Sequence, residues 1–165
     1  MSIPDLAAVL WRQRELLERL VYRLECEQLL MAAGRTRFLG LAIAEVEGLI
    51  EELAVVELQR AAVAQGVARE AGLDPAARLE EIAGSVSPPW TEVLIEHRNA
   101  LLALTGELAA LAEANRHLMA AGLKAVEQAM ASLGLRQGTT SLGYDAQGRS
   151  EVIAGHVRTV VDRSL

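Results

Sequence analysis

The sequence predicts an all-α protein in which long antiparallel helices form a coiled-coil-like bundle, followed by a flexible C-terminal tail. Hydrophobic residues make up 52% of the chain but aromatic residues only 3%, so the apolar content is mostly Leu, Ala, Val and Ile. This composition, with many Glu and Arg residues, favours long helices over sheets. Apolar residues also recur at alternating steps of four and three. We expect a helical bundle domain over residues 1–134 and a partly disordered turn and tail over 135–165.

The first helix is expected from Pro4 to Ala33. Proline is tolerated in a first turn, because its missing N–H would be unpaired there anyway, and Gly34 is a plausible stop. Six of eight positions along one helix-packing line are apolar: Leu6, Leu10, Gln13, Leu17, Leu20, Leu24, Glu27 and Met31.

A second helix is expected from Thr36 to Ala71, ended by Gly72. Its apolar line begins Leu39, Ile43, Val46, Ile50 and Leu53, then slips by one residue to Val56, Val63 and Val67. The connector 73–89 contains Asp74 followed by Pro75, a helix cap followed by proline at the first helical position. A short helix over residues 75–83 is therefore expected.

The third long helix is expected to begin near Pro88, with Ser87 as its cap, and to continue to Leu133. At 1.5 Å per residue it is roughly 65–70 Å long, so it needs partner helices along its length. Seven of nine positions along its packing line are large and apolar: Trp90, Leu94, His97, Leu101, Leu104, Leu108, Leu111, Asn115 and Leu118.

Two polar residues interrupt this line. Asn115 occupies a heptad a position, where a buried Asn fixes helix register at a cost in stability; alternatively, the line drifts away from its partner there. His97 is interpreted as a core histidine rather than a metal ligand, because no second His, Cys or carboxylate pairs with it at metal-binding spacing.

Beyond Leu118 the apolar line is expected to move by one residue and to continue on a different face, through Met119, Leu123, Val126, Met130 and Leu133. Methionine suits adaptable binding surfaces because its side chain refills irregular gaps. This stretch is therefore a candidate binding surface. The alternative is ordinary core with a one-residue shift in the heptad.

Gly134 ends this pattern, and a polar turn follows. Asp145 and Gly148 occupy the first and last positions of an expected type I turn. Tyr144, one of five aromatic residues in the chain, stands directly before it. Residues 152–165 show weak helical periodicity in Val157, Val160, Val161 and Leu165. This segment is marginal as an isolated helix.

Several functional classes are disfavoured. The net charge of −6 and pI near 5.1 argue against nucleic-acid binding. Cys26 is the single cysteine, which fits a reducing compartment. No signal peptide and no membrane-spanning stretch are expected, so a cytoplasmic location is predicted. No catalytic constellation and no cofactor or metal site are expected, since Glu113 and His117 form only one pair at i, i+4.

The stretch "NRHLMAAGLKAVEQAMASLG" and the following "TTSLGYDAQGR" resemble the flagellar export chaperone FlgN. The matching residues are Asn115, Leu118 and Met119 on the long helix, then Tyr144, Asp145 and Gly148. The leucine-rich "LWRQRELLERLVYRLECEQLLMAAG" is similar to the first helix of that family. The resemblance covers residues 5 to about 149.

The resemblance implies a non-catalytic cytoplasmic chaperone that binds the C-terminal helical segment of hook-associated proteins, which join flagellar hook to filament. Such a chaperone prevents premature assembly and delivers its client to the cytoplasmic domain of the flagellar export gate. The client site is expected at Asn115, Leu118, Met119, Leu123, Val126, Met130 and Leu133. Gate docking is expected at Tyr144, Asp145 and Gly148.

The competing hypothesis is a non-catalytic coiled-coil scaffold in which every apolar line is a self-contact. Self-association and client binding use the same exposed apolar helix, so a homo-oligomer of the client-free chain also stays open.

Overall fold

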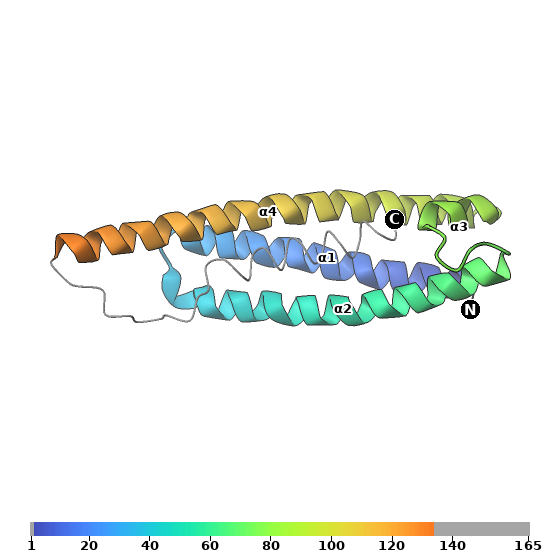
Figure 1. Cartoon of the computed structure of the whole chain (residues 1–165), viewed down its shortest axis with the longest axis horizontal. Coiled ribbons are helices and arrows are strands. Elements are labelled where there is room, and N and C mark those ends of the chain that lie inside the picture. The colour runs from blue at the N-terminus through green and yellow to red at the C-terminus, as the bar shows by residue number, and fades with distance from the viewer. Residues whose placement is uncertain (1, 134–165) are drawn as a thin grey trace.

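The computed structural model describes residues 2–133 and folds them into a helical rod. Its elements are α1 (Ile3–Ala32), the 3₁₀ turn η1 (Thr36–Phe38), α2 (Leu39–Glu70), α3 (Leu79–Ser85) and α4 (Trp90–Ser132). In Figure 1 the three long helices lie side by side, with α1 between α2 and α4. No strand occurs among the described residues. The all-α bundle is therefore confirmed, while the predicted tail lies outside the described residues.

A capping box starts α1, where Ser2 and Asp5 satisfy each other's backbone amides. The Asp5 N–H donates to Ser2 Oγ over 3.3 Å, and the Ser2 N–H donates to Asp5 Oδ2 over 2.8 Å. The Ser2 hydroxyl also donates to Asp5 Oδ2 over 2.7 Å, and this bond, followed by the one from the Ser2 N–H, holds the pKa of Asp5 below its ordinary value. The helix therefore begins one residue before the expected Pro4 and ends at Ala32, one residue before the expected Ala33.

The buried face of α1 follows the predicted line and supplies the centre of the core. Seven of the eight predicted positions are buried, and Met31 is half-buried. The buried seven are Leu6, Leu10, Gln13, Leu17, Leu20, Leu24 and Glu27. Each fully buried Leu is worth roughly 1.5–3 kcal/mol of hydrophobic stabilisation, so α1 is the element that holds its two long neighbours together.

The chain reverses between α1 and α2 at Gly34, whose φ of +65° favours glycine. A single 3₁₀ turn follows, so α2 begins at Leu39 rather than at the expected Thr36. It ends at Glu70, and Gly72 at φ +72° closes its C-terminus as predicted. Its buried residues are all apolar except Arg60: Ala42, Val46, Leu49, Leu53, Val56, Arg60, Val67 and Ala68.

The pairing of α1 with α2 is antiparallel. Arg23 lies 3.0 Å from Glu45, Arg19 lies 3.8 Å from Glu52, and Gln13 Nε2 donates to Glu57 Oε2 over 2.8 Å. In these three pairs the residue number falls along α1 while it rises along α2, as expected for antiparallel helices. The two arginine pairs are half-exposed, so each contributes at most about 1 kcal/mol.

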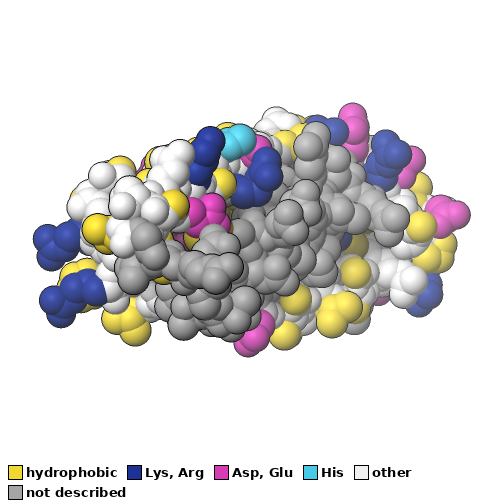
Figure 2. Space-filling model, turned by 60° about the vertical axis from the view of Figure 1, so that its left-hand side comes forward, with side chains coloured by type: hydrophobic (Ala, Val, Ile, Leu, Met, Phe, Trp, Pro, Cys, Tyr) yellow, Lys and Arg dark blue, Asp and Glu magenta, His cyan; other side chains and the backbone are white. Residues whose placement is uncertain are grey.

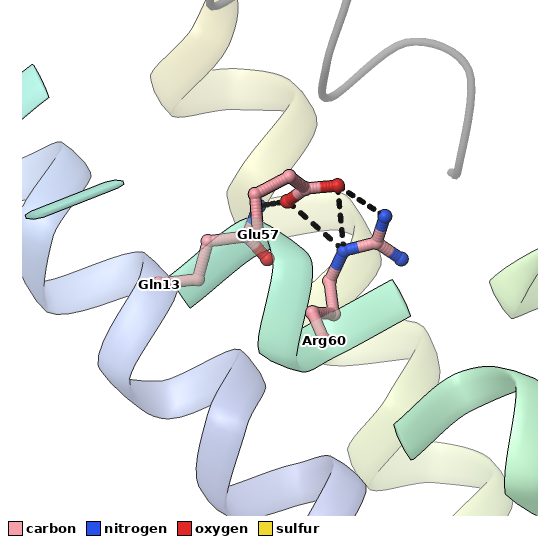
Figure 3. Close-up of polar contacts among 3 residues, drawn as sticks. All are labelled: Gln13, Glu57 and Arg60. Atoms are coloured by element: carbon pink, nitrogen blue, oxygen red, sulfur yellow. Dashed lines mark hydrogen bonds and ion pairs between the residues drawn. The ribbon is translucent and has the colours of Figure 1, made fainter. Parts of the chain in front are cut away.

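One polar cluster sits inside this otherwise apolar contact (Figure 3). Arg60 is only 4% exposed, and its guanidinium makes a forked contact with Glu57 one helical turn away. Glu57 in turn accepts the hydrogen bond from Gln13 of α1. The cluster satisfies a buried cation and ties α2 to α1 at a defined register, because a buried charge without its partner is costly.

The position of α3 corrects the expected short helix over residues 75–83. The Asp74 carboxylate accepts from the Ala76 N–H at 2.7 Å, and the Asp74 carbonyl accepts from the Ala77 N–H at 2.8 Å. These bonds close a local turn instead of starting a helix. The helix begins at Leu79, where Glu81 Oε2 accepts from the Arg78 N–H. Its buried Leu79, Ile82 and Ala83 join the core beside α4.

The last helix, α4, runs for 43 residues, about 65 Å at 1.5 Å per residue. It begins at Trp90 and ends at Ser132, close to the expected Pro88 and Leu133. The expected Ser87 side-chain cap is wrong, because Ser87 contributes its carbonyl, which accepts from the Trp90 N–H. Along α1 the arrangement is parallel: Trp11 contacts His97, and Leu24 contacts Asn115. No helix within residues 2–133 is both long and apolar enough to cross a lipid bilayer.

Candidate binding surface at the end of α4

The inward face of α4 is one continuous line that starts near its N-terminus and reaches its last residue. Seven positions up to Asn115 are buried against the bundle: Leu94, His97, Leu101, Thr105, Leu108, Ala112 and Asn115. Steps of four, four, three, four and three continue from Asn115 through Met119, Leu123, Val126, Met130 and Leu133. We call these last five residues the distal stripe. It occupies the same face as the core residues before it.

This geometry corrects the predicted move to a different face after Leu118. The prediction placed Leu104 and Leu111 on the packing line, but both are only half-buried, while Thr105 and Ala112 are buried. Burial of Thr105 is tolerated because its hydroxyl donates to the Leu101 carbonyl over 2.7 Å. When Thr105 and Ala112 replace Leu104 and Leu111 on the packing line, the line continues past residue 118 on the same helix face.

The cover over this line ends where α1 ends. Because α1 and α4 are parallel and Leu24 lies opposite Asn115, the C-terminus of α1 at Ala32 falls short of the end of α4. The last turns of α4 project beyond α1 in Figure 1. We call residues 119–133 the α4 projection. Its stripe therefore lacks the helix that buries the same face upstream.

Exposure rises along this part of α4. Leu123 is 51% exposed, Val126 56% and Leu133 72%, whereas Leu94 and Leu101 are fully buried. Met119 and Met130 are half-buried, and the flanking Leu118 is 37% exposed. Figure 2 turns this end of the rod toward the viewer and shows apolar side chains at its surface. Several large apolar groups in a row on one exposed helix face are typical of a protein-binding surface.

Asn115, which was expected in the client site, does not belong to this exposed surface in the client-free chain. Its side chain is 3% exposed, and Nδ2 donates to the Leu24 carbonyl over 2.9 Å. Glu27 Oε2 lies 3.4 Å from the same nitrogen. Of the two alternatives for Asn115, the structure favours the register-fixing one, because the amide fixes the level of α4 on α1 at the last covered turn.

Glu27 is the acidic partner in this contact and is itself 6% exposed. Burial raises the pKa of Glu27 to about 7, and the hydrogen bond from Asn115 only partly opposes this rise. The sequence placed Glu27 on the packing line, but its burial beside an amide 88 residues away needs the fold.

His97 is a core histidine, as interpreted from the sequence. It is 3% exposed, and its ring meets that of Trp11 edge to face at 4.9 Å between centroids. Burial, followed by the nearby Arg14 charge, lowers the pKa of His97, against a smaller opposing effect of Glu96. The ring is therefore kept neutral inside the α1–α4 contact.

Glu113 and His117 do approach each other, at 2.9 Å on the exposed side of α4. Glu113 also accepts from Arg116, and this hydrogen bond is the main cause of the lowered pKa of Glu113. Among residues 2–133 no group of three His, Cys, Asp or Glu side chains is arranged to hold a metal ion. The expected docking residues Tyr144, Asp145 and Gly148 lie outside the described residues.

Comparison with known proteins identifies the family of the chain. The family model described as FlgN protein matches residues 1–151. This range contains the whole described bundle, the distal stripe and the residues from Tyr144 to Gly148. No curated protein and no solved structure matches the chain.

Proposed function

The chain belongs to the FlgN family of flagellar export chaperones, and from that premise we propose that its client is held on the distal stripe of α4. The client is the C-terminal helical segment of a hook-associated protein, one of those that join hook to filament. Bound there, the segment is kept from premature assembly until it is delivered to the export gate. The role is non-catalytic and is performed in the cytoplasm.

The observation that carries this proposal is the uncovered continuation of the α4 core line beyond α1. An amphipathic client helix that lies over Met119 to Leu133 takes the place that α1 has upstream. This is helix-in-groove recognition, with anchors at i, i+4, i+7, i+11 and i+14. Leu118 lies beside the stripe and adds a flanking contact.

The energy of such a contact suits a chaperone that must release its client. Full burial of five apolar side chains is worth roughly 7–15 kcal/mol in gross terms. Association and side-chain ordering cost several kcal/mol of this. The most this sum allows is a net free energy of about 8–11 kcal/mol, which corresponds to a Kd of roughly 1 µM to 10 nM.

The test of the client site is Leu123→Asp or Val126→Asp in the full chain. Each places a charge at the centre of the proposed contact, so client capture is expected to fall at least about 100-fold. Helicity and unfolding midpoint are expected to stay near those of the unmodified chain, because both side chains are more than half exposed. Titration calorimetry with a hook-associated C-terminal segment measures client capture, and circular dichroism measures helicity and the unfolding midpoint.

Ala121→Asp is the matched control. Ala121 is exposed on the same projection, but on the side opposite the stripe. Ala121→Asp introduces the same new charge at a helix-propensity cost at least as large, because Ala is the best helix former, and client capture is expected to be retained. Equal loss of capture in all three variants would remove the stripe as the site. Dissociation of an oligomer by Leu123→Asp, without any effect on a client, would instead favour the scaffold hypothesis.

Docking on the export gate is proposed for Tyr144, with Asp145 and Gly148 forming the turn beside it. The proposal is supported by the family match, which extends through these residues to 151. Tyr144→Ala is expected to keep client capture but to lose export, with Tyr144→Phe separating the ring from its hydroxyl. Normal export of clients in a Tyr144→Ala strain would rule out this role.

A further inference from the structure

The last residues of the chain are not explained by the family match, which ends at residue 151. Read as a helix, residues 153–165 place five apolar side chains on one face: Ile153, Val157, Val160, Val161 and Leu165. The opposite face carries Arg158, Thr159, Asp162 and Arg163. Such a segment is marginal as a helix on its own and gains stability by packing its apolar face against another helix.

We propose that residues 153–165 form this helix on the distal stripe and occupy the client site of their own chain when no client is bound. The inference rests on the proposed function for the identity of the site, and it adds a regulation of that site. The tail then acts as a built-in competitor that covers the stripe until a client displaces it.

The lengths match. The stripe runs from Met119 to Leu133, about 21 Å along the helix axis, and thirteen helical residues span about 20 Å. The projection has no α1 beside it, so a helix of this length has room to lie along it. A tail of five β-branched or leucine anchors offers one apolar contact for each member of the stripe.

The connection also permits this arrangement. Residues 134–152 link the end of α4 to the segment, and a random coil of this length spans roughly 24 Å on average. An antiparallel tail helix starts beside Leu133, so the linker needs to cover only the distance between two neighbouring helices. A tether of this kind gives the tail an effective concentration of the order of millimolar at the distal stripe. Even a weak contact is therefore populated within one chain.

The antiparallel direction also gives a consistent register. Pairing Leu133 with Ile153 brings Val126 to the level of Val160 and places Leu165 at the level of residue 121, between Met119 and Leu123. Glu127 then lies within one residue of the level of Arg158. The proposed contact thus combines an apolar line with one pair of opposite charges.

The test is disulfide trapping in the full chain. With Cys26→Ser to remove the native thiol, Val126→Cys is combined either with Val160→Cys or with Thr159→Cys. The two second positions are neighbours on the same tether and differ in the face they occupy. Under mild oxidation, the pair with Val160→Cys is expected to close at least about tenfold faster than the pair with Thr159→Cys, as an intramolecular disulfide. Equal closure rates overturn the proposal, and so does a disulfide-linked dimer as the main product.

Client binding supplies the second measurement. Val157→Asp with Val161→Asp is expected to tighten client binding about tenfold by releasing the competitor, whereas Thr159→Asp leaves it unchanged. Unchanged affinity in the double variant overturns the proposal. If Leu123→Asp abolishes client capture but the two closure rates are equal, the tail inference alone is wrong. If closure is selective but Leu123→Asp does not affect capture, the client site is wrong and the tail contact stands.

Discussion

At the scale of single residues, the contact between Glu27 and Asn115 marks the boundary between bundle and binding surface. Asn115 is the last residue of α4 that the bundle buries, and its amide bonds to α1 directly. The sequence identified Asn115 as a break in an apolar line but left two alternatives open. Its partner could not be identified, because Leu24 and Glu27 come within reach only once α1 and α4 lie parallel.

The raised pKa of Glu27 makes stability depend on pH. In the unfolded chain Glu27 titrates near its ordinary value of 4.5, and in the folded chain near 7. Between these values the folded state binds more protons, so the free energy of unfolding falls as pH rises through this window. The carboxylate is thus a stability cost at pH 8 and none at pH 4.

Glu27→Gln is therefore expected to raise the free energy of unfolding by about 1–3 kcal/mol at pH 8, with little effect at pH 4. Gln imitates the neutral acid that the buried site favours. Urea unfolding at the two pH values measures the difference, with Glu25→Gln on the exposed side of α1 as the control. A gain of the same size at both pH values would contradict the assignment of the buried charge.

At the scale of elements, a single apolar face of α4 is buried against the bundle up to Asn115 and is exposed beyond it. The two parts of this face can therefore be compared within one helix. The sequence predicted the helix, its length and its apolar repeat. It did not predict the position of the face around residues 104–112, because leucines at 104 and 111 compete with Thr105 and Ala112 for the same seam. In the structure the smaller Thr105 and Ala112 are the buried pair, and the Thr105 hydroxyl is satisfied within the helix.

Leu101→Ala and Leu123→Ala test this difference with the same substitution on the same line. Leu101 is fully buried, so its truncation is expected to lower the free energy of unfolding by about 2–5 kcal/mol. Leu123 is 51% exposed, so its truncation is expected to cost less than about 1 kcal/mol in the client-free chain. Denaturant titration of both variants measures the two values. Similar losses would mean that the projection is already covered.

The contact between α1 and α2 depends on the buried cluster of Gln13, Glu57 and Arg60. Glu57→Gln removes the carboxylate that accepts hydrogen bonds from the buried Arg60 guanidinium. Because the buried cation then lacks its charged partner, the free energy of unfolding is expected to fall by about 3–5 kcal/mol. Replacing both charges, as Glu57→Gln with Arg60→Met, is expected to recover most of that loss, because no charge is left buried without its partner. A double variant no more stable than the single one would show that Arg60 has another dominant partner.

At the scale of the whole molecule, the sequence was sufficient for the fold class, the number of long helices and the family. Composition and periodicity fix these features, because a leucine- and alanine-rich amphipathic helix has few alternatives to a bundle. The parallel direction of α1 and α4, and the point where α1 stops covering α4, depend on loop geometry and on contacts distant in sequence. These two features create the binding surface.

Because the distal stripe contains no charged residue, the chain's negative charge should contribute little to client affinity. We expect the Kd for a hook-associated C-terminal segment to change by less than about threefold between 50 and 500 mM NaCl, because screening weakens only charge–charge attraction. Apolar burial should instead give a negative heat-capacity change on binding. Calorimetry at several temperatures and salt concentrations measures both quantities. A steep loss of affinity with salt would place the client on the acidic body of the rod, since the chain carries a net charge of −6, and not on the projection.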